Sequence, residues 1–245
     1  MAVAVENSAY AASVNDISPA LSITTPTANN ILVIFIATEG GPATNWATSI
    51  PSGFTEICNT DGGNMQGLLA YKVAAGTETS IEWTDLSYND DTCMGCVELS
   101  GVDTTSPLDA FGEDESNIST NVTSQSSGSA TATSANGMAI AAIGWDTSQN
   151  ALNGRSYTNS FAEVGTPAYD SWEPMCAFAS LAYTATGSKS TTFSTTDSGC
   201  PMYGAIALFK EAGGAGGPTP IPPSSHNLDN QFSTIIAHRL GGCLQ

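Results

Sequence analysis

The two histidines of the chain, His226 and His238, are the side chains best suited to act as a general base near neutral pH. A Ser-His-Asp triad needs such a base beside its nucleophile. Both histidines lie in the C-terminal segment 226–245, apart from the residues that carry the apolar runs. The sequence therefore predicts no hydrolytic triad. The glycine run at 213–217 lacks a following Lys-Ser or Lys-Thr pair, so we interpret it as a linker and not as a phosphate-binding loop.

Pairs of carboxylates could instead support glycoside hydrolysis. Glu56, Glu82 and Glu98 fall within expected strands, where a solvated strand face is the simpler interpretation. The acidic clusters at 90–91 and 113–115 offer oxygen ligands for calcium, but neither has the alternating spacing of a calcium-binding loop. We therefore expect no catalytic residue, no metal site and no cofactor, and keep a polysaccharide-cleaving enzyme as the weakest alternative.

The six cysteines are few for a chain of 245 residues and indicate no disulfide framework. Cys93 and Cys96 form a Cys-x-x-Cys motif inside an expected strand, where residues three apart point to opposite faces. The chain has no second such motif, and no histidine precedes residue 226. We therefore expect no zinc site and interpret the cysteines as small buried hydrophobes.

Aromatic side chains near expected loops and strand ends could stack on sugar rings, which would suggest a carbohydrate-binding protein. Trp83 is instead expected in the core, because it alternates with polar residues in a short strand. The candidates for sugar stacking are Trp46, Trp145, Tyr157, Tyr169 and Trp172.

The formal net charge of −18 excludes classes of partner. Nucleic acid and anionic membranes both repel a polyanion, so neither is expected to bind this protein. The N-terminus lacks the basic and apolar regions of a signal peptide, and the longest apolar run, 31–37, is too short for a membrane helix. The sequence carries no readable targeting signal.

Short apolar runs separated by Gly, Pro, Asn, Asp and Ser predict an all-β protein, a two-sheet jelly-roll-like β-sandwich. The run at 31–37 has no polar position, so both faces of that strand must be covered by a loop, an insertion or a neighbouring subunit. A homo-oligomer such as a trimer would supply the last of these. The Ser/Thr-rich segment 114–136 is expected to be an exposed loop or edge hairpin. The expected strands are 3–8, 20–24, 31–38, 54–58, 65–74, 80–84, 92–100, 138–146, 161–164, 174–186, 190–194 and 203–210.

Composition divides the chain into three parts: a β-sandwich domain at 1–211, a Gly/Pro-rich linker at 212–225, and a C-terminal arm at 226–245. The first part carries the whole net charge of −18, whereas the rest is neutral. Prolines Pro218, Pro220, Pro222 and Pro223 are expected to hold the linker extended.

The arm is expected to anchor the protein to a partner through apolar residues while the acidic body stays solvated. The alternative is that the arm folds back over the body's own sheet. Arg239 would pair with an acidic partner surface. The apolar anchoring residues are Phe232, Ile235, Ile236 and Leu240.

Several segments together resemble a family of tailed-phage virion proteins with a jelly-roll-like domain, found as capsid decoration or head-fibre proteins and in tails. The resemblance implies assembly and not chemistry, because its motifs are turns and buried strands. The segments that carry it are TPTANNILVIFIATEGG (25–41), IPSGFTEI (50–57), LLAYKVAAGTETSIEWT (68–84), VELSGVDTTSPLDA (97–110), GMAIAAIGWD (137–146) and YGAIALFKEA (203–212).

These observations lead to the hypothesis of a non-enzymatic capsid decoration or cement protein that sits on the virion. Its partner would be the major capsid protein, another virion protein or a sister subunit. The alternative is a carbohydrate-binding adhesin or tail-fibre component that contacts a host glycan.

Overall fold

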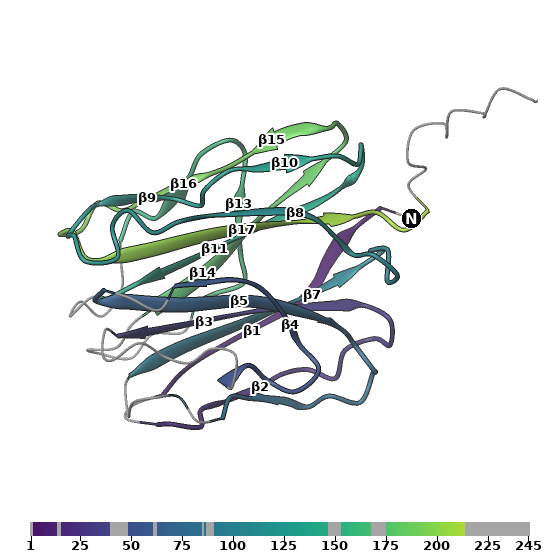
Figure 1. Ribbon diagram of the computed structural model, residues 1–245, viewed down its shortest axis with the longest axis horizontal. Coiled ribbons are helices and arrows are strands. Elements are labelled where there is room, and N and C mark those ends of the chain that lie inside the picture. The colour runs from purple at the N-terminus through teal and green to yellow at the C-terminus, as the bar shows by residue number, and fades with distance from the viewer. Residues whose placement is uncertain are drawn as a thin grey trace, which may run out of the picture. The chain divides into compact units, whose positions relative to one another are not determined.

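The structure is a computed structural model that describes residues 2–13, 16–39, 49–60, 63–84, 86, 91–146, 153–167 and 175–213. Within these residues the fold is all-β, and every sheet is antiparallel. None of the described segments forms a helix with the length and hydropathy needed to cross a membrane. The prediction of an all-β protein is thus confirmed, and two five-stranded sheets pack face to face at its centre (Figure 1).

The first of these sheets contains the N-terminal strands and has the order β1-β7-β3-β5-β4. Its central strand is the doubly apolar segment of the sequence. Its members, in spatial order, are β1 (Ala4–Ser13), β7 (Thr92–Ser100), β3 (Ile31–Glu39), β5 (Met65–Val73) and β4 (Thr55–Thr60).

The second sheet is built from the other half of the described chain and has the order β13-β14-β11-β17-β8. Its three inner strands are as long as those of the first sheet. Its members, in spatial order, are β13 (Ala162–Val164), β14 (Met175–Tyr183), β11 (Gly137–Trp145), β17 (Met202–Lys210) and β8 (Leu108–Asp114).

Three small sheets lie over the outer faces of this sandwich (Figure 1). One covers the first sheet and two cover the second. They are β2 (Ala20–Ser22) with β6 (Ser80–Glu82), β10 (Ala130–Ala132) with β15 (Gly187–Lys189), and β12 (Ser156–Tyr157) with β16 (Thr192–Ser194) and β9 (Ser124–Ser126).

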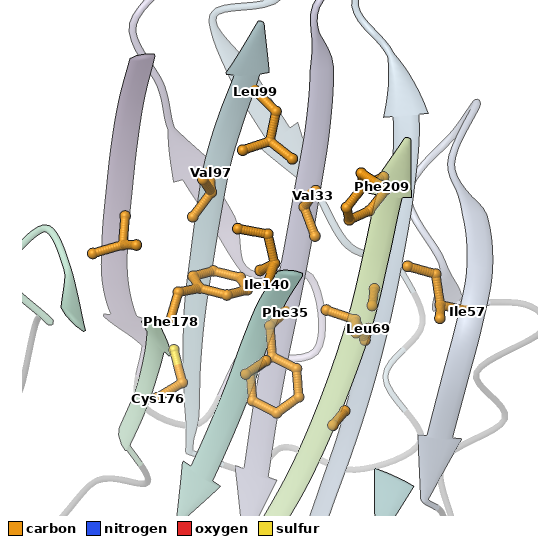
Figure 2. Packing of buried hydrophobic residues seen from close by; sticks show 14 of the residues in the cluster. Val33, Phe35, Ile57, Leu69, Val97, Leu99, Ile140, Cys176, Phe178 and Phe209 are labelled. Carbon is orange, nitrogen blue, oxygen red and sulfur yellow. The ribbon is translucent and has the colours of Figure 1, made fainter. Parts of the chain in front are cut away.

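The main core fills the space between the two large sheets, where alternate residues of facing strands interdigitate (Figure 2). Phe35 of β3 packs edge-on against Phe178 of β14, with ring centroids 6.3 Å apart. Phe35 also stacks on Tyr203 of β17 at 6.0 Å. These three rings join a strand of the first sheet to two strands of the second, so neither sheet is complete without the other.

The outer face of β3 is buried by the chain itself. Ile34 and Ile36 pack under Leu21 of β2, Ile81 of β6 and Trp83, which is fully buried. The prediction that an additional element covers the doubly apolar strand is confirmed, as is the core position of Trp83. Because this cover comes from the same chain, the strand gives no support for an oligomer.

The Ser/Thr-rich segment 114–136 is where the sequence-based expectation was wrong. It forms β9 and β10, and Gln125, Ala130 and Ala132 are buried. The segment covers the outer face of the second sheet, with Ala130 and Ala132 in one of its apolar clusters. Small side chains let the backbone approach the sheet closely, which a count of polar residues does not reveal.

The two large sheets have the same topology. Each sheet contains three nine-residue strands, of which the first along the chain is central (β3 or β11) and is flanked by the second (β5 or β14) and the third (β7 or β17). An earlier strand, β1 or β8, pairs with the third of these strands, β7 or β17. A short strand, β4 or β13, comes just before the second, β5 or β14, and pairs with it. The small ladders β2-β6 and β10-β15 also arise at matching points. The described chain is therefore an internal repeat, with one sheet per copy.

Register supports this repeat residue by residue. Glu56 pairs with Ala70 in the first copy, and Glu163 pairs with Ala179 in the second. Phe54 N–H donates to Pro51 O at 3.1 Å, and Phe161 N–H donates to Thr158 O at 3.2 Å, so the same turn enters both strands. The sequence signal is the pair GFTEI (53–57) and SFAEV (160–164), where the first residue has φ of 80° and 63° respectively.

Candidate functional site

The anchoring residues predicted from the sequence lie outside the described residues, which end at Gly213. The same holds for most of the linker at 212–225 and for the whole arm at 226–245. Their positions therefore stay predictions. The residues concerned are Pro218, Pro220, Pro222, Pro223, Phe232, Ile235, Ile236, Arg239 and Leu240.

Glu98 is the buried carboxylate of the first sheet, with 3% of its surface exposed. Its Oε2 accepts a hydrogen bond of 2.6 Å from Asn7 Nδ2 of β1. Its Oε1 accepts one of 2.8 Å from Thr27 N–H and one of 2.6 Å from Asn30 Nδ2. Glu98 therefore fastens the edge strand and the β2–β3 connection to β7.

The three strand glutamates do not form a catalytic pair. Glu98 is enclosed by its three donors, whereas Glu56 and Glu82 are exposed and take part in separate local hydrogen bonds. Asn59 Nδ2 donates to Glu56 at 2.6 Å, and Ser80 Oγ donates to Glu82 at 3.3 Å. A general acid must reach a glycosidic oxygen, which the enclosed Glu98 carboxylate cannot do.

An open groove beside β6 is a candidate binding site of the described surface. Its volume is about 210 Å³. Lys72 Nζ lies 2.8 Å from Glu78 Oε1 and 5.3 Å from the centre of the Phe54 ring, so a cation, a carboxylate and an aromatic face meet there. The groove is lined by Pro51, Ser52, Phe54, Lys72, Glu78, Ser80, Ile81 and Glu82.

Glu78 is held in its ionised form. Burial acts to raise its pKa, but hydrogen bonds from the Ala75 N–H and from Lys72 outweigh burial and lower the pKa to about 2. The Gly76 N–H donates to the same carboxylate at 3.0 Å. A carboxylate this acidic cannot deliver a proton near neutral pH, so Glu78 is suited to binding polar ligands and not to acid catalysis.

A second ion pair involves Glu163 of β13, the strand of the second copy that matches β4 and not the β5 strand of the groove. Arg155 donates from Nε and Nη2 to both carboxylate oxygens of Glu163, each at 2.9 Å. Tyr157 donates to Glu163 Oε2 at 3.1 Å. The bond to Glu163 raises the pKa of Arg155, and burial raises the pKa of Tyr157. This bidentate pair fixes β12 to β13 and leaves Glu163 no role as a base.

Cys58, Glu113 and Tyr203 form a polar contact at the edge of the main core. Tyr203 donates to Glu113 Oε2 at 2.9 Å. Burial raises the pKa of Cys58 to about 12, although a hydrogen bond with Tyr203 acts in the opposite direction. The thiol is therefore protonated near neutral pH and is not a nucleophile there.

Of the aromatic residues predicted for sugar stacking, the structure describes Trp145 and Tyr157, and both pack on Phe193. Trp145 is fully buried and stacks on Phe193 at 5.1 Å, so that prediction was wrong. The reason is that β9 and β16, which are distant in sequence, cover the end of β11. Tyr157 also packs against Phe193, at 5.6 Å. Trp46, Tyr169 and Trp172 lie outside the described residues.

The Cys-x-x-Cys motif divides between two cores, as its spacing predicts. Cys93 belongs to the main core between the large sheets, whereas Cys96 belongs to the outer core under β2 and β6. Among the described residues no group of three or more His, Cys, Asp or Glu is placed to hold a metal ion. Of the acidic clusters, Glu113 accepts from Tyr203 and Asp114 from the Ser116 N–H. Glu113 and Asp114 thus serve local structure.

Comparison of the chain with protein-family models, with curated proteins and with solved structures found no match.

Proposed function

We propose that this protein is a non-enzymatic structural component of a tailed-phage virion, a capsid decoration protein of jelly-roll type that attaches through its C-terminal arm. Its partner in this proposal is the major capsid protein or another virion protein. The resemblance of its strand and turn motifs to such proteins is the starting point. The distribution of apolar surface is the observation that carries the proposal.

The described body buries nearly all of its apolar side chains within itself. Of its large hydrophobic residues, only Ile17, Val73 and Phe111 are more than a third exposed, at 48%, 38% and 49%. They come from three different parts of the chain, and scattered apolar residues are normal on a protein surface. The described part of the body thus offers little apolar docking surface, which favours the arm as the part that attaches.

The arm supplies what the body lacks. Phe232, Ile235, Ile236 and Leu240 stand in a segment with no net charge, next to a body that carries the whole charge of −18. Burying four such side chains contributes on the order of 6–10 kcal/mol before the cost of ordering the arm. Many copies on one lattice make a modest affinity per copy sufficient.

A sedimentation assay tests the proposal. The full chain and a variant ending at Gly213 are mixed with phage particles that lack the protein, and the fraction that sediments with the particles is measured. We expect the full chain to bind and the shortened chain to stay in the supernatant with an unchanged circular dichroism spectrum, since all four apolar clusters end before Lys210.

Point variants separate attachment from folding. Ile235→Asp places a charge among the apolar anchors and is expected to abolish co-sedimentation. Asp229→Asn, in the same arm, is the matched control and should bind as the unmodified chain does. Binding by the shortened chain, or by Ile235→Asp at full strength, would refute attachment through the arm.

A carbohydrate-binding adhesin is the second candidate, and the groove beside β6 favours it. Phe54, Lys72 and Glu82 there provide an aromatic face and charged groups of the kind that bind sugars. A glycan array probed with the chain ending at Gly213 tests this function, with Phe54→Ala as the loss-of-binding variant. Signal that survives the truncation and is lost in Phe54→Ala would favour the adhesin over the decoration protein.

A further inference from the structure

Two cysteines from different copies of the repeat meet at the centre of the sandwich. Cys93 lies on β7 of the first sheet. Cys176 lies on β14 of the second sheet (Figure 2). Their Sγ atoms are 3.0 Å apart, so one thiol donates to the other. Both side chains are fully buried. The contact bridges 83 residues of sequence and joins the two sheets.

The register places this contact in a row that crosses each sheet at equivalent positions. In the first sheet the row runs Cys93, Ala37, Gly67 over β7, β3 and β5. In the second sheet the equivalent row runs Tyr203, Gly144, Cys176 over β17, β11 and β14.

The two rows lie face to face, and the order of equivalent residues in one row is the reverse of the order in the other. A Cβ at Gly144 would lie 2.9 Å from the Ala37 Cβ, and a Cβ at Gly67 would lie 2.7 Å from the Tyr203 ring. Cys93 therefore faces Cys176 for the same reason that Gly67 faces Tyr203. The repeat brings each pair together across one approximate twofold axis, which passes near Ala37 and Gly144.

The equivalent pairs are filled differently. One end of the row holds a glycine and a tyrosine, whereas the other end holds two thiols. The fold thus does not demand sulfur at this position, because a large and a minimal side chain fill the matching space. What the two thiols add is the capacity to form a bond between the copies.

We propose that Cys93 and Cys176 form a disulfide that links the two sheets when the chain folds under oxidising conditions. The Sγ atoms need to approach by about 1 Å to reach the S–S bond length. Cys96 is turned to the outer core by its place on the same strand, so it does not compete for Cys176.

The reaction is a thiol–disulfide exchange with a small disulfide such as oxidised glutathione. One cysteine thiolate attacks the small disulfide, forms a mixed disulfide and releases one small thiol. The second cysteine thiolate then attacks the sulfur of the first cysteine and releases the other small thiol. The two cysteines lose two electrons and two protons in total, and the small disulfide gains them as two thiols.

The reaction is expected to occur before the core closes. Burial raises the pKa of Cys176 well above its usual value, so the folded protein offers no thiolate and no access at this position. The bond would restrict a loop of more than 80 residues in the unfolded chain. The expected rise in melting temperature is on the order of 10 °C.

Oxidative refolding of the full chain tests the proposal. The reduced, unfolded protein is diluted either into oxidised and reduced glutathione or into excess reductant, and the folded fraction is isolated by size exclusion. Alkylation under denaturing conditions then counts the remaining thiols, and peptide mass spectrometry locates the linked pair. We expect one disulfide, between the peptides that contain Cys93 and Cys176, and a higher melting temperature in the oxidised sample.

For each variant, the melting temperature of the oxidised sample is compared with that of the reduced sample. A loss of packing caused by the substitution lowers both values and therefore cancels in their difference. The difference in melting temperature should vanish in Cys93→Ala and in Cys176→Ala. It should persist in Cys96→Ala, the matched control on the same strand. A folded oxidised sample with all thiols open to alkylation, a different linked pair, or a difference that persists in Cys93→Ala would overturn the proposal.

Discussion

Replacing the buried carboxylate of Glu98 tests whether this strand glutamate is a structural fastener. The Glu98→Ala variant removes the acceptor for Asn7 Nδ2, Thr27 N–H and Asn30 Nδ2 at once. The side chain is 3% exposed, so water does not easily take its place between β1 and β7. We expect the first sheet to lose this side-chain fastening of its edge strand, while the backbone pairing of β1 with β7 remains.

The magnitude follows from the number and type of these bonds. Hydrogen bonds to a charged group contribute about 1.5–3 kcal/mol each, but two of the three donors, Asn7 and Thr27, are exposed and can bond to water in the variant. Removing the buried charge also recovers its desolvation cost. The expected loss in the free energy of unfolding is therefore about 2–4 kcal/mol, well below the simple sum.

Equilibrium unfolding in urea, followed by tryptophan fluorescence and by circular dichroism, measures this loss. Glu82→Ala is the matched control, since Glu82 is an exposed strand glutamate and should change stability by no more than about 0.5 kcal/mol. Asn30→Ala combined with Glu98→Ala should be less destabilising than the sum of the two, because both remove the same bond.

A loss below about 1 kcal/mol in Glu98→Ala would refute the reasoning, because three bonds to a buried carboxylate cannot be worth so little. Additive effects of Asn30→Ala and Glu98→Ala would also contradict the shared bond. Polysaccharide cleavage that disappears in Glu98→Gln without loss of stability would assign the residue to catalysis instead.

Three further perturbations follow from the same contacts. The pKa of Glu78 is lowered from 4.5 to about 2, so its carboxylate stabilises the fold above pH 4.5 and this contribution is lost as the pH falls through 2. Urea titrations between these pH values should show that the stability of Glu78→Gln depends less on pH than that of the unmodified chain. Gly144→Ala should cost about 1–3 kcal/mol, because its new Cβ would lie 2.9 Å from that of Ala37, and denaturant midpoints will show it. Trp145→Ala should cost about 3–5 kcal/mol by calorimetry without any change in glycan binding, since the ring is buried on Phe193.

The internal repeat explains how this all-β chain builds its large central core. Each copy contributes one sheet with an apolar inner face, and neither face is buried until the two copies meet. The fold therefore has the arrangement of a twofold dimer joined in one chain. The thiol pair of Cys93 and Cys176 stands at the contact between the copies, where a bond would hold them together.

Local patterns were sufficient for the long strands. The runs around β3, β5, β7, β11, β14 and β17 were predicted within a few residues, since an apolar or alternating run between turn residues can bury itself only as a strand. Glycines mark two of the turns between these strands, since Gly76 and Gly101 have φ values of 81° and 71°, which other residues rarely adopt. The strand at 108–114 and the small strands of 124–132 were missed, because polar and small residues give a weak signal.

The sequence by itself determined the all-β class, the positions of the inner strands and the opposite faces of Cys93 and Cys96, because each depends on neighbours within a few residues. Only the tertiary structure decided that Glu98 is enclosed, that Trp145 is covered and that Cys93 meets Cys176. These three outcomes depend on which distant segments lie together, and the pairing of one sheet with another is set by the packing of the whole core and not by any local pattern.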